Sequence, residues 1–331
     1  MGKIKVAING FGRIGRVTFR AMINDAGIEI VAINDLTDAT TLAHLLKYDS
    51  IHGRFDGSIE TSDASLIVNG HTIATLRERD PAALPWGEMG VDTVLESTGL
   101  FRDEAGASGH ITAGAKKVVV SAPPGEGNIK SVVLGINDDI LDGSEHVISN
   151  ASCTTNCAAP MIKVLDDNWG VDHGFITTIH SYTGDQRLHD APHKDLRRAR
   201  AAAQSMIPTT TGAAKAITKI FPHLGGHLGG CGIRVPVADG SLTDITCTLK
   251  SEATEEAINK AFKEAAAGDL KGILEYTNDP IVSVDTIGNP HSCIFDSLLT
   301  SVLGKMVKIV GWYDNETGYS NRLVDLINRI G

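Results

Sequence analysis

Short runs of valine and isoleucine alternate with amphipathic segments through the first 150 residues of the chain. The runs lack the strict alternation of a half-exposed strand, which is typical of strands buried on both faces of a sheet. Strands are predicted at residues 4–8, 28–35, 92–98, 116–122, 131–136 and 146–150, and helices at residues 13–25 and 40–48. The pattern predicts an α/β domain in which helices cover a mostly parallel, doubly wound sheet.

The pattern changes after about residue 150, where longer segments alternate apolar and polar residues. Strands are predicted at residues 175–180, 234–250, 280–286 and 306–313. A helix is predicted after Thr254, which is a good N-cap, and it should end at Gly268. A last helix is predicted over residues 319–330. We therefore expect a second, α+β domain with a largely antiparallel sheet, and place the boundary between the domains near residue 150.

Length and composition agree with this division. A chain of 331 residues is long enough for two cores. The formal charge of −10 argues against a dedicated nucleic-acid or anionic-membrane surface, and no run of apolar residues is long enough to span a membrane. Since the N-terminal residues also lack the pattern of a signal peptide, we expect a cytoplasmic protein.

Five cysteines do not form the even set that a disulfide framework requires. Cys153 and Cys157 are four residues apart, but no second pair of cysteine or histidine ligands follows at the spacing of a zinc site. We therefore expect no metal.

The segment "NGFGRIGR" places Gly10, Gly12 and Gly15 in G-x-G-x-x-G spacing between a predicted strand and a predicted helix. In this setting the first glycine allows a tight turn, the second a close approach to a pyrophosphate, and the third close packing of helix and strand. Asp35 ends the next predicted strand, where a carboxylate would accept hydrogen bonds from the adenosine ribose. A carboxylate there also repels a 2′-phosphate, so the segment predicts binding of NAD rather than NADP.

The segment "SNASCTTNC" places Cys153 at or near the start of a predicted helix. The N–H groups and dipole of a helix N-terminus stabilise a thiolate, so we expect a lowered thiol pKa and a nucleophilic cysteine. Ser152, Thr154 and Asn156 could help to hold an oxyanion or a phosphate oxygen. Cys157 is expected to be buried and inert.

A thiolate catalyst usually needs a histidine. His180 ends a predicted strand and is the best placed of twelve, although a core histidine is an equally good interpretation. Three further features suit phosphate. They are the basic segment 187–200, the "PTTTGAAKA" segment with Thr211 and Gly212 before a helix, and Arg234 within an apolar strand. The basic segment is equally consistent with a solvated loop and helix or with a subunit contact.

The chain resembles the phosphorylating glyceraldehyde-3-phosphate dehydrogenases. The segments that carry this resemblance are "INGFGRIGR", "NASCTTNC", "HSYTGDQRLHDAPHKDLRRARAA", "IPTTTGAAKA" and "WYDNETGYSNR". It implies a glycolytic homotetramer in which residues 1–150 form a Rossmann-type NAD-binding domain, completed by the C-terminal helix 315–331. Residues 151–314 would form the catalytic domain.

The resemblance also implies roles for individual residues. Cys153 would be the nucleophile and His180 its base. The positions that would hold glyceraldehyde 3-phosphate and inorganic phosphate are Ser152, Thr154, Thr183, Arg198, Thr211, Gly212 and Arg234. The positions that would hold NAD include Gly10, Gly12, Arg13, Ile14, Asp35, Arg79, Ser121 and Asn315, the last at the nicotinamide carboxamide. Arg197 is an alternative to Arg198.

One departure from the family pattern bears on cofactor specificity. Ala191 and Pro192 stand where NAD-specific bacterial members commonly have Leu-Pro and NADP-using relatives tend to have Ala-Ser. Dual use of NAD and NADP therefore stays open beside NAD alone. The other functions considered are an erythrose-4-phosphate dehydrogenase and, from another class, a thiol-based redox sensor or moonlighting binding protein.

Overall fold

A computed structural model describes residues 2–331 of the chain. The chain divides into two compact units. Unit 1 comprises residues 2–132, 138–151 and 320–331, and unit 2 comprises residues 133–137 and 152–319.

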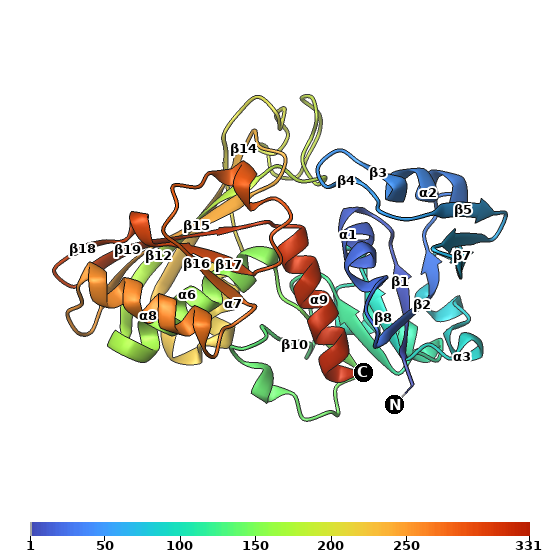
Figure 1. Cartoon of the computed structure of the whole chain (residues 1–331), viewed down its shortest axis with the longest axis horizontal. Coiled ribbons are helices and arrows are strands. Elements are labelled where there is room, and N and C mark those ends of the chain that lie inside the picture. The colour runs from blue at the N-terminus through green and yellow to red at the C-terminus, as the bar shows by residue number, and fades with distance from the viewer. Residues whose placement is uncertain (1) are drawn as a thin grey trace. The chain divides into compact units, whose positions relative to one another are not determined.

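Unit 1 is built on one nine-stranded sheet with the order β10-β11-β9-β8-β1-β2-β7-β6-β5 (Figure 1). Its strands are β1 (Ile4–Asn9), β2 (Ile28–Asn34), β5 (Ile59–Ser62), β6 (Ser65–Val68), β7 (His71–Leu76), β8 (Thr93–Glu96), β9 (Lys117–Val120), β10 (Lys130–Ser131) and β11 (Val147–Ser149). All neighbouring pairs are parallel except β5–β6 and β6–β7. The chain crosses from β1 to β2 on one side and later adds β8 on the other, which makes the carboxyl end of β1 a switch point where ligands bind in such sheets.

The helices of unit 1 are α1 (Arg13–Met22), α2 (Ala39–Lys47), α3 (Trp86–Met89), α4 (Glu104–Ala107) and α5 (Gly109–Thr112). A short hairpin of β3 (Tyr48–Asp49) and β4 (Gly53–Arg54) stands apart from the main sheet. Helix α1 buries Val17, Phe19 and Met22, and Phe19 meets Phe11 edge to face. This packing fixes the start of α1 close to the end of β1.

Unit 2 contains an eight-stranded sheet with the order β13-β14-β12-β15-β19-β17-β16, and β18 pairs with β19. Its strands are β12 (Val171–Ser181), β13 (Ile207–Thr209), β14 (Leu228–Val235), β15 (Ser241–Leu249), β16 (Leu274–Thr277), β17 (Cys293–Asp296), β18 (Ser301–Leu303) and β19 (Met306–Tyr313). Only the β12–β14 and β16–β17 pairs are parallel. The predicted fold class, a mostly parallel Rossmann-type α/β sheet with a second, largely antiparallel sheet, is confirmed.

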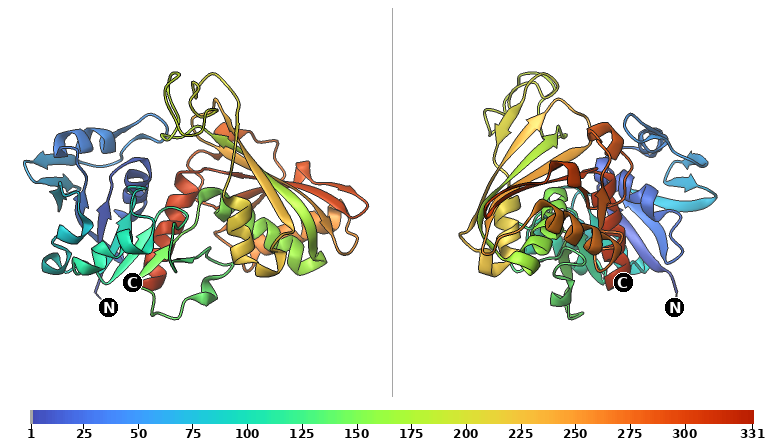
Figure 2. Two further views of the ribbon diagram at one scale, coloured as in Figure 1. Left: turned by 180° about the vertical axis from the view of Figure 1, so that it is seen from behind. Right: turned by 60° about the vertical axis from the view of Figure 1, so that its left-hand side comes forward.

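Residues 182–206 of unit 2 contain neither a helix nor a paired strand longer than one bridge. Figure 2 shows them as long yellow-green loops that extend from the strands of their own unit. The chain leaves the sheet after β12 and returns to it at β13, so the basic segment predicted at 187–200 lies within these loops.

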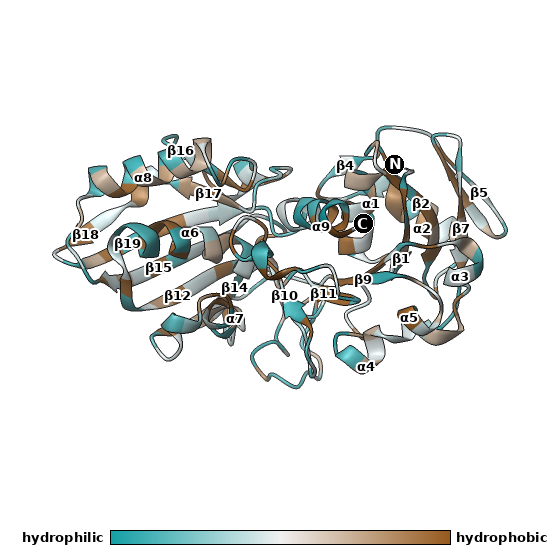
Figure 3. Cartoon of the chain, turned by 90° about the horizontal axis from the view of Figure 1, so that it is seen from below, coloured by the Kyte–Doolittle hydropathy of each residue, from teal (hydrophilic) through white to brown (hydrophobic). Residues whose placement is uncertain are grey.

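Helices α6 (Cys153–Trp169), α7 (Ala213–Ile220) and α8 (Glu255–Ala267) cover one face of the unit 2 sheet (Figures 1 and 3). Thr254 caps α8 as predicted, because its hydroxyl accepts the N–H of Ala257 at 3.2 Å. The helix ends at Ala267 with Gly268 as its C-cap, and it buries Ile258 and Phe262. Helix α9 (Thr317–Ile330) ends the chain, and its residues from 320 onward belong to unit 1.

Two predicted strands are wrong. In the segment predicted at 131–136 only Ser131 belongs to a strand, β10, because Asn137 accepts the N–H of Val133 and turns the backbone. Residues 280–286 contain the 3-10 helix η4 (Ser283–Thr286) instead of a strand. There the carboxylate of Asp285 accepts the N–H of Val282, and such local side-chain bonds compete with strand pairing.

No helix formed by residues 2–331 combines the length and the apolar character that crossing a bilayer requires.

Candidate active site

The glycines of the fingerprint occupy three different environments in unit 1. Gly10 has φ +91°, and a Cβ there would lie 2.7 Å from the backbone nitrogen of Thr98. A Cβ on Gly15 would lie 2.2 Å from the carbonyl oxygen of Gly10. Gly12 is exposed, and a Cβ on it would meet no protein atom within 4 Å. Gly10 and Gly15 therefore serve tight packing, while Gly12 leaves space that a ligand can approach.

The carboxylate of Asp35 is held beside this loop by two backbone donors. Its Oδ2 accepts the N–H of Phe11 at 2.8 Å, and its Oδ1 accepts the N–H of Thr37 at 3.0 Å. A cavity of about 360 Å³ opens here, lined by Asn9, Gly10, Gly12, Asn34, Asp35, Leu36, Glu78, Arg79, Ser97, Thr98, Leu100 and Phe101. The open glycine, the helix N-terminus and the fixed carboxylate fit the pyrophosphate and ribose of a dinucleotide.

The other predicted cofactor residues lie outside this cavity lining. Arg13 makes a bidentate ion pair with Asp49 at 3.0 and 3.2 Å, and Ile14 is half-buried on α1. Ser121 follows β9 and donates its N–H to the carbonyl of Glu96. Asn315 belongs to unit 2 and is buried, and its Oδ1 accepts the hydroxyls of Ser181 and Ser241 at 2.7 and 2.6 Å.

Cys153 is the first residue of α6, as the sequence predicts. Ser152 is the N-cap, and its hydroxyl accepts the N–H of Thr155 at 3.1 Å. Cys157 lies one turn further along the helix, is fully buried, and donates to the carbonyl of Gly311. Cys153 and the neighbouring backbone N–H groups therefore lie at the N-terminus of α6, while Cys157 packs into the interior of unit 2.

His180 lies near the end of β12, and its Nε2 is 3.4 Å from Cys153 Sγ. The imidazole is 6% exposed and meets the ring of Tyr313 edge-on at a centroid distance of 6.0 Å. A thiol and an imidazole nitrogen at this distance can exchange a proton. The geometry therefore favours the catalytic interpretation of His180 over that of a core histidine.

Arg234 lies beside His180 on the opposite side from the thiol. Its Nη1 is 2.7 Å from His180 Nδ1 and donates to the carbonyl of Ser181 at 3.0 Å. The Nδ1 atom is also 2.8 Å from that carbonyl oxygen. Two tautomers of His180 are compatible with these contacts. If Nδ1 carries the proton and donates to the Ser181 carbonyl, Nε2 is free to accept the thiol proton. If Nδ1 accepts from Arg234, the proton is on Nε2 and faces Sγ.

Burial and Arg234 together set the charges of this pair. Burial raises the pKa of the Cys153 thiol to about 11, although Arg234 and the N–H of Thr154 oppose the shift. Burial and then the charge of Arg234 lower the pKa of His180 to about 3. The predicted net lowering of the thiol pKa is therefore wrong for the chain without ligands, because desolvation exceeds the effect of the helix N-terminus. The neutral thiol and neutral imidazole are favoured in this state.

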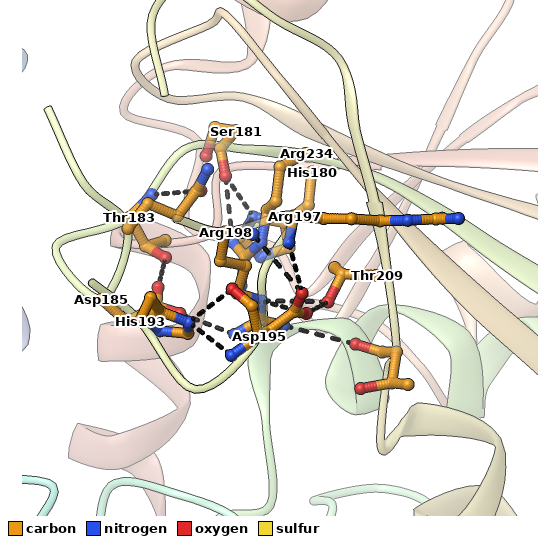
Figure 4. A network of polar contacts seen from close by, with 12 residues as sticks. His180, Ser181, Thr183, Asp185, His193, Asp195, Arg197, Arg198, Thr209 and Arg234 are labelled. Atoms are coloured by element: carbon orange, nitrogen blue, oxygen red, sulfur yellow. Dashed lines mark hydrogen bonds and ion pairs between the residues drawn. The ribbon is translucent and has the colours of Figure 1, made fainter. Parts of the chain in front are cut away.

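Arg198 joins the same group of side chains, whereas Arg197 does not. Arg198 donates to Asp185 at 2.6 Å and to the hydroxyl of Thr209 at 3.0 Å. Figure 4 shows Arg197 pointing away from this cluster, and the side chain is exposed. Thr183 donates its hydroxyl to Asp185, which connects it with Arg198.

The remaining predicted anion-binding residues lie at helix ends. Thr211 accepts the N–H of Ala213 at 3.2 Å, and Gly212 is the N-cap of α7. The hydroxyl of Thr154 is 3.0 Å from that of Tyr313, so its side chain is engaged in the core of unit 2. Thr154 can therefore offer its backbone N–H to a substrate, but its hydroxyl is already bonded.

Sequence reasoning missed Asp185 and Tyr313. Burial raises the pKa of Asp185, but the hydroxyl of Thr183 and the charges of Arg234 and Arg198 hold it below its ordinary value. Tyr313 places its hydroxyl between Thr154 and Thr178, at 3.0 and 2.9 Å. Asp185 lies between Gly184 and Arg187 in the sequence, and this setting is only weak evidence that its side chain belongs to a site. Nothing local to "GWYDN" indicates that Tyr313 packs beside His180.

Comparison with known protein families matches both units. Residues 4–104 match the model of the NAD binding domain of glyceraldehyde 3-phosphate dehydrogenase. Residues 152–315 match the model of the C-terminal domain of the same enzyme.

Three curated relatives are similar over nearly their whole length. The glyceraldehyde-3-phosphate dehydrogenase of Mycobacterium avium is 58% identical over 336 residues, which cover 99% of this chain and 98% of the relative. That of Streptomyces coelicolor is 59% identical over 332 residues, with the same coverage. Glyceraldehyde-3-phosphate dehydrogenase 1 of Bacillus subtilis is 56% identical over 325 residues, which cover 98% and 97% of the two chains. The chain therefore belongs to the glyceraldehyde 3-phosphate dehydrogenase family.

Proposed function

We propose that this chain oxidises D-glyceraldehyde 3-phosphate and couples the oxidation to the formation of 1,3-bisphosphoglycerate from inorganic phosphate, as a step of glycolysis. The observation that carries the proposal is the 3.4 Å contact between Cys153 Sγ and His180 Nε2, with Arg234 directly beside it. A nucleophile, a base and a fixed cation at one site are what acyl transfer to phosphate requires.

NAD⁺ would supply the hydride acceptor when it is bound. In unit 1 the loop at Gly10 and Gly12 would hold the pyrophosphate, and Asp35 would hold the adenosine ribose. Arg79, which also lines the cavity, would contact the cofactor there. Arg13, Ile14 and Ser121 would support this binding, and Asn315 would hold the carboxamide of the nicotinamide. The two hydroxyls that bond Asn315 Oδ1 orient its amide for such a contact. Asp35 favours NAD over NADP, because a 2′-phosphate would be repelled by its carboxylate.

Cys153 Sγ attacks the aldehyde carbon while the thiol proton passes through His180 Nε2 to the aldehyde oxygen, which gives a hemithioacetal. His180 Nε2 removes the hydroxyl proton as the hydride leaves the same carbon, and this step gives a thioester on Cys153. An oxygen of inorganic phosphate then attacks the thioester carbon, the C–S bond breaks, and the acyl phosphate leaves while Sγ is restored as a thiolate. A thiolate is a better leaving group than an alkoxide, so cysteine suits this second transfer better than serine would.

Two anionic groups must be held during these steps, the phosphate of the substrate and inorganic phosphate. We assign this role to Arg198 and Arg234 as cations, with hydroxyl and N–H donors from Ser152, Thr154, Thr183, Thr211 and Gly212. Arg198 is preferred to Arg197 because its guanidinium lies within the cluster. Binding of an anion beside Arg234 would offset the charge that lowers the pKa of His180, and so would make the base more effective.

An erythrose-4-phosphate dehydrogenase would share the cysteine and the cofactor but would hydrolyse its thioester. Arg198 and the threonine-rich segment before α7 favour a second phosphate as co-substrate instead. A thiol-based redox sensor or moonlighting binding protein would need Cys153 alone. The contact with His180 and the complete glycine fingerprint favour the enzyme.

The proposal is tested by following NAD⁺ reduction with glyceraldehyde 3-phosphate in the presence and absence of phosphate or arsenate. We expect sustained turnover only when one of these anions is present, and equal rates without them would contradict the phosphorylating assignment. Parallel assays with erythrose 4-phosphate and with NADP⁺ separate the alternatives. Cys153→Ser should keep NAD⁺ binding and lose turnover.

We also propose that the chain is cytoplasmic and assembles as a homotetramer. All five cysteines are free, which suits a reducing compartment. Unit 2 exposes several large apolar side chains, which a subunit contact would cover, namely those of Phe175, Leu188, Leu196 and Met206. Sedimentation should give four times the chain mass of 35.0 kDa, and a monomer at micromolar concentration would contradict this.

A further inference from the structure

A chain of buried polar side chains lies beneath the dinucleotide cavity of unit 1. It begins at Trp86, whose Nε1 donates to Nδ1 of His110 at 3.0 Å. His110 Nε2 lies 3.0 Å from Oε2 of Glu96. Trp86 and His110 are fully buried, and Glu96 is 1% exposed. A polar cluster at this depth has to be fully hydrogen-bonded to be tolerated.

The contact with Trp86 defines the protonation of His110. An indole nitrogen is a donor only, so Nδ1 of His110 must accept and cannot carry a proton. The ring is therefore neutral, with its proton on Nε2, and it donates to Glu96. Asn9 Nδ2 donates to the same oxygen of Glu96 at 2.6 Å, which explains why it lies 3.3 Å from His110 Nε2 without bonding to it.

Glu96 receives four donors, and no lysine or arginine among residues 2–331 forms an ion pair with it. His110 and Asn9 donate to Oε2, while the N–H and the hydroxyl of Thr98 donate to Oε1. A buried carboxylate without a counter-ion contributes little to stability, because its desolvation cost is as large as the bonds that it gains. The groups that this carboxylate binds indicate what it does in unit 1.

The groups held by Glu96 line the cavity. Thr98 lines it directly and its hydroxyl accepts the N–H of Leu100, a second lining residue. Asn9 extends this hydrogen-bond network to the neighbouring strand β2, because its Oδ1 accepts a hydrogen bond from Nδ2 of Asn34 at 2.7 Å. Asn34 in turn bonds both the N–H and the carbonyl of Glu78, each at 2.8 Å. One carboxylate thus orders the ends of β1, β2 and β8 and the segment after β7.

We propose that His110, as the neutral Nε2–H tautomer, is a positioning residue for the cofactor cavity. It holds the carboxylate of Glu96, and Glu96 holds Asn9 and Thr98 in the arrangement that receives the dinucleotide. The inference rests on the proposed binding of NAD at this cavity. It assigns to Trp86, His110 and Glu96 a function in binding rather than in the chemical steps, since none of them lines the cavity.

A matched pair of substitutions tests the proposal. In His110→Gln the amide nitrogen can reach the position of Nε2 and still donate to Glu96, whereas in His110→Asn the shorter amide reaches only the position of Nδ1. We expect Kd for NAD⁺ and for ADP-ribose to rise about tenfold or more in the Asn variant, the effect of losing one hydrogen bond to a charged group. The Gln variant should stay within about threefold of the wild type, and kcat at saturating NAD⁺ should change little in both.

Equal losses in both variants would indicate packing alone and overturn the proposal, and so would unchanged affinity in both. Thermal unfolding of each variant shows whether it is folded. If the Asn variant does not fold, ¹⁵N NMR of the wild-type histidines decides the matter, because a proton on Nδ1 of His110 is incompatible with the proposal. Failure of the wild type to bind NAD⁺ or ADP-ribose would contradict the proposed function instead, and the NMR measurement would still test the tautomer.

Discussion

Arg234 and His180 are register partners on the parallel strands β14 and β12, and their side chains meet with Nη1 2.7 Å from Nδ1. The strand pairing therefore fixes a permanent positive charge on the side of the imidazole that faces away from Cys153. This charge lowers the pKa of both His180 and the thiol, in each case beside a larger effect of burial. Substitution of the arginine should separate these contributions.

Arg234→Leu should slow the alkylation of Cys153 by iodoacetamide. Loss of the guanidinium removes an interaction that favours the thiolate, so the fraction of thiolate at mildly alkaline pH should fall, by about tenfold if the thiol pKa rises by one unit. The rate is measured on the enzyme without cofactor or substrate, by mass spectrometry of the Cys153 peptide. Iodoacetamide is uncharged, so the arginine does not attract the reagent itself.

Arg234→Lys is the control for this experiment, because it keeps the charge and loses the fork of the guanidinium. Its alkylation rate should lie nearer to that of the wild type than to that of the Leu variant. If the Leu variant reacted as fast as the wild type, Arg234 would have no effect on the thiol.

The local parts of this site could be predicted from sequence, and the long-range parts could not. Ser152 is a good N-cap directly after a buried strand, so the position of Cys153 at a helix start follows from neighbouring residues. The glycine fingerprint is likewise local, and its context of strand and helix is visible in the hydrophobic pattern. Both predictions use residues within about one turn of each other.

The contacts of Tyr313 and Asp185 depend on which strands and loops come together. Tyr313 follows Thr154 by more than 150 positions, and strand order decides that they meet. The lowered thiol pKa that the sequence predicts is wrong for a related reason, because a helix N-terminus can be predicted from sequence while the degree of burial cannot. The strand predicted at 131–136 shows that an apolar run alone does not specify pairing when an asparagine side chain can turn the backbone.

Arg198→Gln should weaken the binding of phosphate groups much more than Arg197→Gln does. Arg198 lies within the cluster of Asp185 and Thr209, while the side chain of Arg197 is exposed and points away. We expect KM for glyceraldehyde 3-phosphate or for inorganic phosphate to rise by about 10- to 100-fold in the Arg198 variant, in line with the loss of charge-assisted hydrogen bonds. Steady-state kinetics with each substrate varied in turn provide the measurement.

Arg197→Gln serves as the matched control, since it removes the same charge one residue away. Its KM values should stay within about threefold of the wild type, as for most exposed substitutions. A larger effect at Arg197 than at Arg198 would assign the anion site to the other arginine.

Asp239→Asn should stabilise the protein at neutral and alkaline pH. Burial, with the nearby carboxylates of Asp314 and Glu316, raises the pKa of Asp239 from 3.8 to about 9. Asp314, the first of these neighbours, accepts the N–H groups of Gly288, Glu316 and Thr317. Asparagine resembles the protonated form of Asp239 and carries no proton to lose.

The sign of the pH effect follows from proton binding. Between pH 3.8 and about 9 the folded chain retains the proton of Asp239 while the unfolded chain has lost it. The free energy of unfolding of the wild type should therefore fall as pH rises, by up to about 1.4 kcal/mol per unit from this group. Urea unfolding at several pH values should show a shallower slope for Asp239→Asn. Asp63→Asn, at an exposed position, should leave the slope unchanged, and an equal slope in all three proteins would contradict the assignment.

Gly12→Ala and Gly15→Ala should separate cofactor binding from stability within one loop. The new methyl group at position 12 meets no protein atom within 4 Å, and the backbone there has φ −69°, which alanine adopts without strain. The Gly12 variant should unfold at the same temperature as the wild type, but its Kd for NAD⁺ should rise by about tenfold or more because the methyl group occupies the space of the pyrophosphate.

At position 15 the methyl group would lie 2.2 Å from the carbonyl oxygen of Gly10, so that variant should lose at least about 1–3 kcal/mol of stability. Thermal unfolding and isothermal titration with NAD⁺ measure the two effects, and a Gly12 variant that binds NAD⁺ normally would show that the pyrophosphate does not lie against this loop.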